Sequence, residues 1–230
     1  MILFLMVFNL AWSQDRAVYS QGSSNYSLNS MLTDLKGEPL LAGNEVSVEG
    51  SPFYSSDWSR GSITLASGKK FVNVMVRLNL HSDRVHYLIE DTNTERVASI
   101  STITEVEFTD SETNRLVRFR CGYPVAGKND LKTFYKVLAD GKATLLKQDK
   151  RILIEEKPFN SATITRRFDI DRDYFVLINN SMVPLKRTKA GLAEIFSDRQ
   201  AEIEKYISEN KIRLKEDEDL AKVVNYYNSL

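Results

Sequence analysis

The chain has 230 residues, with 31 lysine and arginine residues against 31 aspartate and glutamate residues, so its formal net charge is zero. No segment collects enough charge of one sign to make a continuous basic stripe, which argues against nucleic acid or an anionic membrane surface as a partner. The hydrophobic content of 42% is typical of a globular protein, and the single cysteine, Cys121, excludes an intramolecular disulfide.

Residues 1–13 resemble a secretory signal peptide. Residues 2–12 are mainly apolar but too few to span a bilayer as a helix, and the pattern Ala11-Trp12-Ser13 predicts cleavage after Ser13. The usual positive n-region is missing. No cysteine lies near the cleavage point, and no later apolar run is long enough to cross a membrane. We therefore expect an exported, periplasmic or extracellular protein without a lipid anchor or a transmembrane segment in the mature chain.

The mature chain divides into three parts by pattern. Residues 14–43 are rich in serine and asparagine and predict a mobile N-terminal segment. Residues 44–187 contain thirteen short runs with period-two alternation, which predict a large antiparallel β-sheet body. Turn residues at Ser67-Gly68, Asp140-Gly141 and Asn179-Asn180-Ser181 favour sequential hairpins. A sheet of more than ten strands must hide its edges, so we expect a barrel-like or sandwich body.

Three aromatic residues, Phe53, Tyr54 and Trp58, fall within the eight loop residues 51–58. The sequence allows two interpretations of them. They can plug the end of the sheet against the core, which we favour, or they can form a stacking platform for a ligand. If the protein binds a ligand through this loop, these three side chains are its predicted binding residues.

Both histidines, His81 and His86, lie in the segment LNLHSDRVHYL. A two-residue turn at Ser82-Asp83 would place both imidazoles on a polar, solvent-facing side of a hairpin. A hydrolase using His81, Asp83 and His86 with a metal would need one or two further ligands, which the sequence does not offer. We favour the exposed hairpin and predict no catalytic residue, metal site or cofactor.

Three other features have ordinary structural explanations. Cys121 at a strand end is expected to be a partly buried structural thiol. Glu105 and Glu107 are expected on the solvated face of a half-exposed strand. The run 169–173, Asp-Ile-Asp-Arg-Asp, resembles the start of a calcium loop, but Tyr174 and Asn180 stand where that loop requires glycine and glutamate. We therefore predict an acidic turn between two strands there.

Residues 188–230 change to a helical period. Three apolar faces predict three helices, and they consist of Leu192, Ile195 and Phe196, then Ile203, Tyr206 and Ile207, then Leu220, Val223, Val224 and Tyr227. Ser197 and Gln200 fit a capping box at the start of the second helix. The acidic run 216–219 should occupy the first turn of the third, where the helix dipole stabilises carboxylates.

Three segments in this order carry a resemblance: EGSPFYSSDWSRGSITLASGKKFVNVMVRLNLHSDRVHYL, FRCGYPVAGKNDLKTFYKVLADGKATLLK and IFSDRQAEIEKYISENKIRLKEDEDLAKVVNYYNSL. Over residues 45–230 the chain resembles a group of uncharacterised exported proteins of Bacteroidetes-type bacteria. The resemblance implies an exported bacterial protein, but it implies no activity, ligand or catalytic residue. The hairpin after VRLNL has no obligatory histidines in that group, so His81 and His86 are expected to be local variation.

Together these patterns predict an α+β protein with an antiparallel sheet body and a C-terminal helical segment. We expect a non-enzymatic binding or structural module of the bacterial envelope, whose partner is an unidentified protein, glycan or lipid. The alternative is a carrier that holds a lipid or another hydrophobic ligand in a β-barrel-like cavity, with the aromatic loop as its lid.

Overall fold

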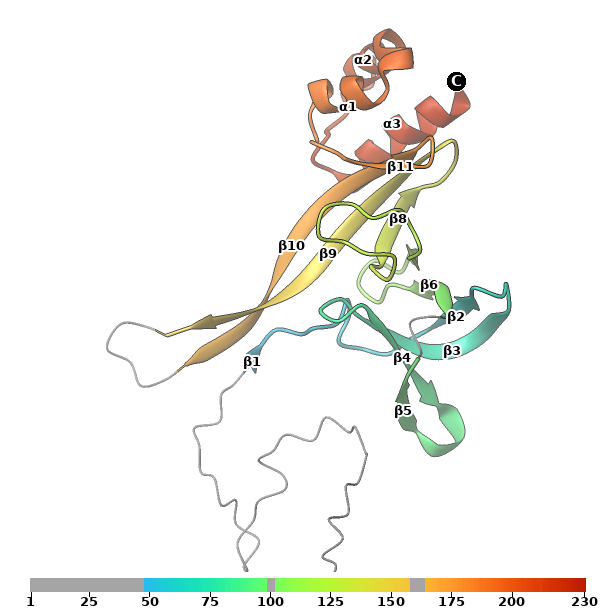
Figure 1. Cartoon of the computed structure of the whole chain (residues 1–230), viewed down its shortest axis with the longest axis vertical. Coiled ribbons are helices and arrows are strands. Elements are labelled where there is room, and N and C mark those ends of the chain that lie inside the picture. The colour runs from blue at the N-terminus through green and yellow to red at the C-terminus, as the bar shows by residue number, and fades with distance from the viewer. Residues whose placement is uncertain (1–47, 99–101, 158–163) are drawn as a thin grey trace, which may run out of the picture. The chain divides into compact units, whose positions relative to one another are not determined.

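The computed structural model describes residues 48–98, 102–157 and 164–230. They form one large sheet followed by three α-helices, which confirms the predicted α+β class (Figure 1). The predicted signal peptide (1–13) and N-terminal segment (14–43) lie outside the described residues. The strands are β1 (Val48–Glu49), β2 (Ser59–Leu65), β3 (Lys70–Asn79), β4 (Arg84–Ile89), β5 (Thr94–Val97), β6 (Ile103–Thr109), β7 (Leu116–Arg120), β8 (Tyr135–Ala139), β9 (Ala143–Glu156), β10 (Thr165–Ile178) and β11 (Ser181–Pro184). The helices are α1 (Lys189–Ile195), α2 (Gln200–Glu209) and α3 (Asp217–Ser229).

The eleven described strands belong to a single open sheet. Its order is β1-β10-β9-β8-β7-β6-β2-β3-β4-β5, with β11 also paired to β10, and every pair is antiparallel except β1 with β10. The antiparallel body is therefore as predicted, but its expected barrel-like or sandwich form is not observed. The outer strands β1, β5 and β11 have only two to four residues each. Short outer strands limit the unpaired backbone, so the described sheet protects its edges without closing.

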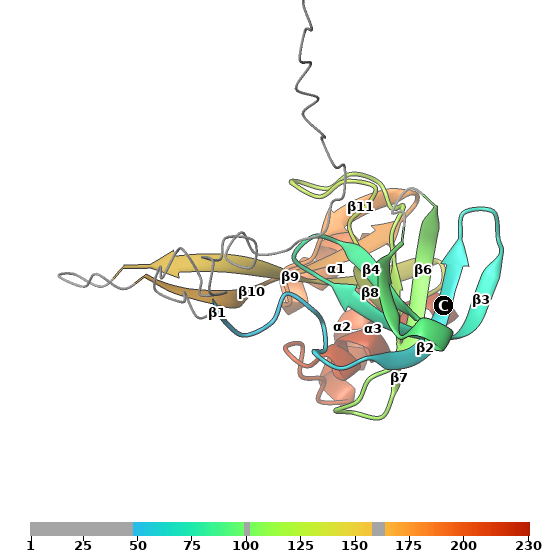
Figure 2. The ribbon, with the colours of Figure 1, turned by 90° about the horizontal axis from the view of Figure 1, so that it is seen from below.

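Strands β9 and β10 form a ribbon of two paired 14-residue strands. Their far ends extend beyond the other strands except β1, which pairs with the start of β10, as Figure 2 shows. The alternation had predicted two shorter strands in place of each, with an acidic turn at residues 169–173. That turn is wrong, because all five residues lie inside β10 and pair with β9. Polar side chains are compatible with a strand here, since this part of the ribbon is exposed.

The three predicted turns all join neighbouring strands. Gly68 has a φ of 82° between β2 and β3, and Asn179 and Asn180 have φ values of 49° and 58° between β10 and β11, as a type I′ turn requires. Gly141 lies between β8 and β9 but is not among the residues with positive φ. An added Cβ there would lie 2.5 Å from the Nδ2 atom of Asn228 in α3. Glycine is therefore needed at 141 for close packing rather than for turn type.

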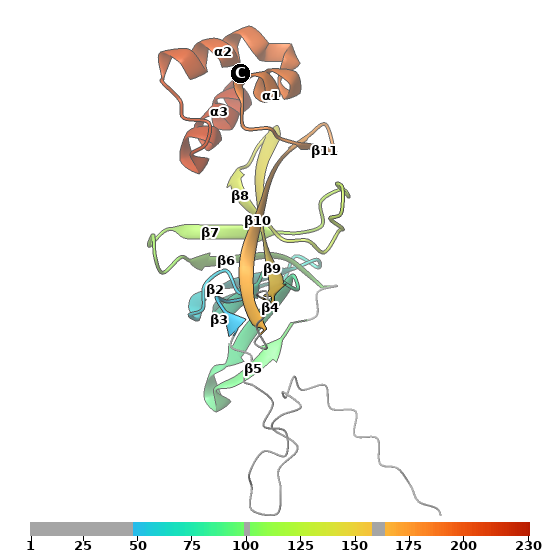
Figure 3. The ribbon, with the colours of Figure 1, turned by 90° about the vertical axis from the view of Figure 1, so that its left-hand side faces the viewer.

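Three hydrophobic clusters stabilise the sheet. The first lies under the face of β2, β3, β4, β6 and β7 and includes Phe119 and the thiol of Cys121. The second joins β9 and β10 to the helices, which gather at one end of the ribbon (Figure 3). The third, around Tyr135 and Phe175, covers the opposite face of the ribbon with the segment before β8. Near the helices, the ribbon is thus buried on both faces.

Most residues that the period predicted are buried, including Leu192, Ile203 and Leu220, while Ile195 and Tyr206 are only half-buried. Helix α1 begins after Thr188, whose side chain accepts a hydrogen bond from the Gly191 amide at 3.1 Å. The predicted capping box is wrong, because residues 197–199 form a separate 3₁₀ turn and no side chain caps α2. The tertiary packing of Phe196, fully buried in the second cluster, outweighs the local capping preference.

Three residues of the acidic run, 217–219, occupy the first turn of α3 as predicted, while Glu216 precedes them as the N-cap residue. All three carboxylates have specific partners, and that of Glu218 is Arg115. Asp217 accepts from Lys147 at 2.7 Å and from Tyr174 at 2.6 Å, which joins α3 to the ribbon. Asp219 is buried and accepts from Lys222 at 2.8 Å and from the backbone amide of Arg213 at 3.0 Å. These hydrogen bonds lower the pKa of Asp219 to about 2.

Candidate functional site

A polar cleft of about 630 Å³ lies between the β9–β10 ribbon and the loop that precedes β8. We call it the ribbon cleft. Its volume falls within the range of small-molecule sites. It is lined by Asp83, Ala126, Gly127, Lys128, Asn129, Asp130, Thr133, Gln148, Lys150, Ile152, Asp171, Asp173, Phe175 and Pro184. The loop is the yellow-green segment beside β9 in Figure 1.

The ribbon supplies one wall of the cleft through strand alternation. Every second side chain of a strand points to the same face, so 148, 150 and 152 of β9 share a face with 171, 173 and 175 of β10. The register places Gln148 opposite Asp173 and Lys150 opposite Asp171. This wall therefore combines two carboxylates, an amide and an ammonium with the apolar side chains of Ile152 and Phe175.

The loop is held against the ribbon by a pair of amides. Asn129 Nδ2 donates to Gln148 Oε1 at 2.7 Å, and Gln148 Nε2 donates to Asn129 Oδ1 at 2.9 Å. Gln148 is buried, so this reciprocal pair satisfies both amides where water has little access. Asp130 then ends the loop by accepting from the backbone amide of Lys132 at 2.9 Å. The cleft is therefore a built feature with a fixed wall on each side.

The charges of the cleft do not balance. Four aspartates and two lysines line it, which leaves an excess of two negative charges. Lys150 Nζ lies 2.6 Å from Asp83 Oδ2, in the β3–β4 turn, and so neutralises that carboxylate. Within the described ranges, neither Asp171 nor Asp173 has a hydrogen bond or an ion pair to its side chain. The cleft thus presents two uncompensated carboxylates side by side on β10.

A buried tyrosine lies next to the cleft. Tyr135 is 1% exposed, and its hydroxyl has no hydrogen-bond partner within the described part of the chain. Burial raises the pKa of Tyr135 to about 12, the neighbouring amide of Asn129 opposes the rise, and the carboxylates of Asp83, Asp130 and Asp173 add to it. The hydroxyl therefore lies within electrostatic range of three carboxylates that line the cleft.

The predicted ligand-binding aromatics do not form one platform. Phe53 and Trp58 both lie against Arg77, whose guanidinium carbon is 3.8 Å and 4.5 Å from their ring centres. Glu95 accepts a hydrogen bond from Arg77 at 3.0 Å, so the guanidinium contacts two aromatic rings and one carboxylate. Tyr54 instead packs against Phe108 and Phe119 of the core. Of the three aromatic side chains, Tyr54 packs against the core and the other two contact Arg77.

Tyr54 also takes part in a polar network beneath the loop. Its hydroxyl donates to Asp110 and accepts from Lys136 Nζ at 3.0 Å. Burial, followed by the hydrogen bond to Asp110, raises the pKa of Tyr54 well above its ordinary value. Burial and the neighbouring Lys147 lower the pKa of Lys136. The network fixes Tyr54 to β8 and to the residue that follows β6, so its hydroxyl already has partners inside the protein.

The two histidines have separate partners. His81 is exposed, and its Nδ1 lies 2.9 Å from the carbonyl of Arg151. His86 is only 15% exposed and lies against Phe53 with its Nδ1 2.5 Å from Glu95, so the prediction that both imidazoles face solvent is wrong for His86. The register differs from the expected one, since a four-residue turn pairs Asn79 with Arg84. Across residues 48–98, 102–157 and 164–230, no three histidine, cysteine or acidic side chains converge as a metal site would require.

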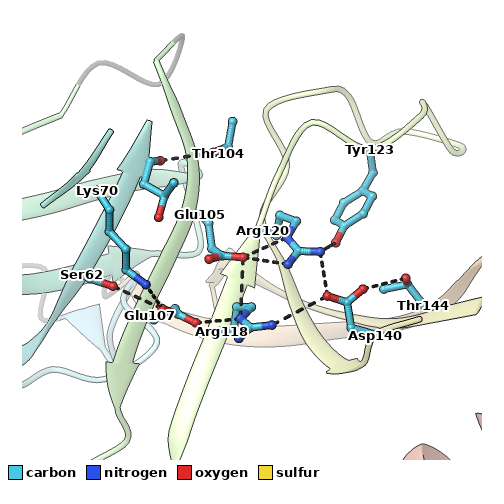
Figure 4. A network of polar contacts seen from close by, with 11 residues as sticks. Ser62, Lys70, Thr104, Glu105, Glu107, Arg118, Arg120, Tyr123, Asp140 and Thr144 are labelled. Atoms are coloured by element: carbon cyan, nitrogen blue, oxygen red, sulfur yellow. Dashed lines mark hydrogen bonds and ion pairs between the residues drawn. The ribbon is translucent and has the colours of Figure 1, made fainter. Parts of the chain in front are cut away.

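The two glutamates of β6 take part in an ion-pair ladder across the sheet (Figure 4). Glu107 accepts from Lys70 of β3 at 2.6 Å and from Arg118 of β7 at 2.8 Å. Glu105 accepts from Arg120 at 3.0 Å, and Arg120 continues the ladder to Asp140. The glutamate side chains are 17% and 12% exposed, so the predicted solvated face is instead covered by cross-strand pairs. The carboxylates of the ladder are paired with its own lysine and arginine side chains, so few of its charged groups are left to bind a ligand.

Two further features bear on the sequence predictions. Cys121 is buried, donates to the Ile103 carbonyl at 3.1 Å, and has its pKa raised to about 11 mainly by burial, in agreement with a structural thiol. An apolar groove of about 340 Å³ lies between β2, β3 and the residues on either side of 99–101, with Phe71 and Tyr87 in its lining. Residues 99–101 are not described.

The sequence did not predict the ribbon cleft. Its walls come from three separate segments, around 83, 126–133 and 148–175, and no local motif joins them. One signal was present, because Asp171 and Asp173 are two residues apart and therefore share a face of any strand. Because a turn was predicted at this position, the two aspartates were not expected to share a face of a strand.

Comparison of the chain with known protein families, with curated proteins and with solved structures finds no match. Within the described residues, the helices are all too short or too polar to cross a membrane.

Proposed function

We propose that the protein is an exported, non-enzymatic binding module of the bacterial envelope that holds its ligand in the ribbon cleft. The observation that carries this proposal is the cleft itself, which combines a fixed wall on each side with carboxylates that have no internal partner. Polar groups of this kind, placed in a concave site beside apolar side chains, are what ligand recognition requires. Export rests on the apolar N-terminal sequence with its small residues at 11 and 13.

The side chains best suited to catalysis, one thiol and two imidazoles, have other contacts in the fold. The thiol of Cys121 is buried and hydrogen-bonded, and the imidazoles of His81 and His86 contact different parts of the chain. A nucleophile needs an adjacent base and access to substrate. These contacts support a binding role over a hydrolytic one.

Site-specific photo-crosslinking in living cells tests the proposal. A photo-reactive amino acid is placed at Lys128, on the rim of the cleft, and in a matched chain at Lys205, which is exposed on α2 and far along the sequence from every lining residue. We expect a discrete adduct from position 128 and none from position 205. Equal labelling at both positions, or no adduct at 128 in the exported fraction, would contradict the proposal.

The alternative is a carrier of a lipid or another hydrophobic ligand. In the described residues the sheet is open, so this carrier lacks the barrel-like cavity that the sequence suggested, and the feature that still favours it is the apolar groove near Phe71. Native mass spectrometry of freshly purified protein separates the two functions. A bound mass of lipid size that is lost on changing Phe71→Glu, and kept on changing Asp173→Asn, would favour the carrier.

A further inference from the structure

The ribbon pairs its carboxylates with cations almost everywhere. On β9 and β10 four carboxylates have an arginine within 3.8 Å, namely Asp149 with Arg172, Glu155 with Arg166, and both Glu156 and Asp169 with Arg167. The two remaining carboxylates of these strands are Asp171 and Asp173, the pair in the cleft. Unpaired acid is therefore confined to the concave part of the ribbon.

The neighbours that could neutralise this pair are committed to other contacts. Lys150 lies directly across the ladder from Asp171, yet its ammonium goes to Asp83. Gln148 lies across from Asp173, and both atoms of its amide group are bonded to Asn129. A concave wall with like charges focuses the negative potential and raises the local concentration of cations.

Two further observations indicate the kind of cation. The described side chains offer no group of three metal-ligating residues, which favours an organic cation over a metal ion. Phe175 and Ile152 lie on the same face as the two carboxylates and can cover an alkyl chain, as apolar surfaces do for the stems of lysine and arginine. The buried hydroxyl of Tyr135, which has no hydrogen-bond partner among the described residues, lies close to Asn129 and to three cleft carboxylates and provides an additional polar group at the cleft wall.

We propose that the ribbon cleft recognises a ligand with a protonated amine on an alkyl chain, through ion pairs to Asp171 and Asp173. This inference rests on the proposed function, since it names the ligand class of the same cleft. A lysine side chain of a partner peptide and a free aliphatic diamine share this chemistry. Lys128 on the rim and the paired Lys150 would repel additional cations, which limits the site to one ligand of modest charge.

Isothermal titration calorimetry of the mature chain tests the ligand class with four probes. They are an end-blocked Ala-Lys-Ala tripeptide, the same peptide with acetylated lysine, 1,5-diaminopentane and calcium chloride. We expect saturable binding of one amine probe per chain, no binding of the acetylated peptide, and no calcium binding at the cleft. A higher affinity for the tripeptide than for the diamine would identify a peptide ligand, and the reverse order would identify a free amine.

Matched variants assign any binding to the two carboxylates. The double change Asp171→Asn with Asp173→Asn should weaken amine binding at least tenfold, whereas Asp169→Asn, on the same face of β10 but outside the cleft lining, should leave it within twofold. The asparagine pair should also leave the melting temperature unchanged or raise it, because no ion pair is lost.

Equal binding of the acetylated peptide, or amine binding that survives the asparagine pair, would overturn the inference. Failure of every amine probe would also overturn it, while an adduct from position 128 in cells would still support the proposed function. Absence of both would count against the cleft as a binding site altogether. The ligand class and the site can therefore fail independently.

Discussion

Asn228, near the end of α3, should be one of the most important polar side chains for stability. Its Oδ1 accepts from the backbone amide of Ala143 at 2.7 Å, and its Nδ2 donates to the carbonyl of Ala143 at 2.9 Å. Ala143 is fully buried at the start of β9. The change Asn228→Ala leaves both backbone groups without a partner, at about 1 to 3 kcal/mol for each. Since Asn228 is only half-buried and water can reach part of the site, we expect a loss of about 2 to 4 kcal/mol in the free energy of unfolding.

Gly141 provides a second, coupled perturbation. The change Gly141→Ala would place a Cβ 2.5 Å from Nδ2 and 2.8 Å from Cγ of Asn228, so the asparagine side chain has to leave its position. In the Asn228→Ala background there is no such side chain to displace, and Gly141→Ala should cost little. The two changes should therefore be strongly non-additive, with a coupling of about 1 to 2 kcal/mol.

Urea unfolding followed by far-ultraviolet circular dichroism measures all four chains of this cycle. The conservative change Asn228→Asp is a useful control, because it keeps the acceptor for the Ala143 amide and loses only the donor. It should fall between the wild type and Asn228→Ala. A loss below about 0.5 kcal/mol for Asn228→Ala, or additive effects of the two changes, would refute the reasoning that Gly141 is required by close packing.

Further predictions address the β3–β4 hairpin, Asp219 in the first turn of α3, and the N-terminus. Leu80→Ala should cost about 2 to 5 kcal/mol by thermal unfolding, because Leu80 is 2% exposed, whereas His81→Ala should change stability by less than about 0.5 kcal/mol. Asp219 has a pKa of about 2 in the folded chain against an ordinary 3.8, so its stabilising effect should be complete above that ordinary value and lost as the pH falls through about 2. Wild type and Asp219→Asn should therefore differ in stability at pH 7 and converge near pH 2. N-terminal sequencing of the exported protein should begin at Gln14, directly after Ser13.

The helical region could be predicted in detail because its signals are local. A 3.6-residue period is set by neighbouring residues, and the side chains that the period selected are buried in or packed against one hydrophobic cluster. The capping box failed because one residue, Phe196, is fixed by tertiary packing at the point where the cap would form. Local preferences of about 1 kcal/mol are easily outweighed by burial of a whole aromatic side chain.

The register of the β3–β4 hairpin depended on a contact that alternation does not reveal. The side chain of Asn79 accepts from the amides of His81 and Ser82, each at 3.0 Å, and this favours a four-residue turn over the expected two-residue turn. Asp83, at a φ of 53°, ends the turn in the left-handed region and directs its carboxylate to Lys150. This local contact therefore decided the position of a cleft residue, whereas His86 keeps its expected face and is covered there by Phe53 and Glu95.

The cleft could not be predicted for a different reason. More than forty residues separate Asp83 from Ala126, the next lining residue along the chain. Only the sheet order brings the β3–β4 turn and the loop before β8 to the same face of the ribbon. Alternation in β9 and β10 is also obscured, because polar residues occupy both faces in the middle of each strand. Hydrophobic patterns identify what is buried, whereas this site consists of residues that remain accessible.

The contrast within one ribbon is the strongest argument that the cleft has a function. On the opposite face of the same two strands, Asp149 is held by Arg172 at 2.6 Å and by Lys147 at 3.5 Å, so its charge is fully matched. On the cleft face of β10, Asp171 and Asp173 have no such cation within the described part of the chain. Uncompensated like charges in a concave site lower stability, and proteins commonly give up stability at the positions where they bind other molecules. A purely structural ribbon would be more stable with asparagine at both positions, so a ligand that supplies the missing cation explains why carboxylates stand there.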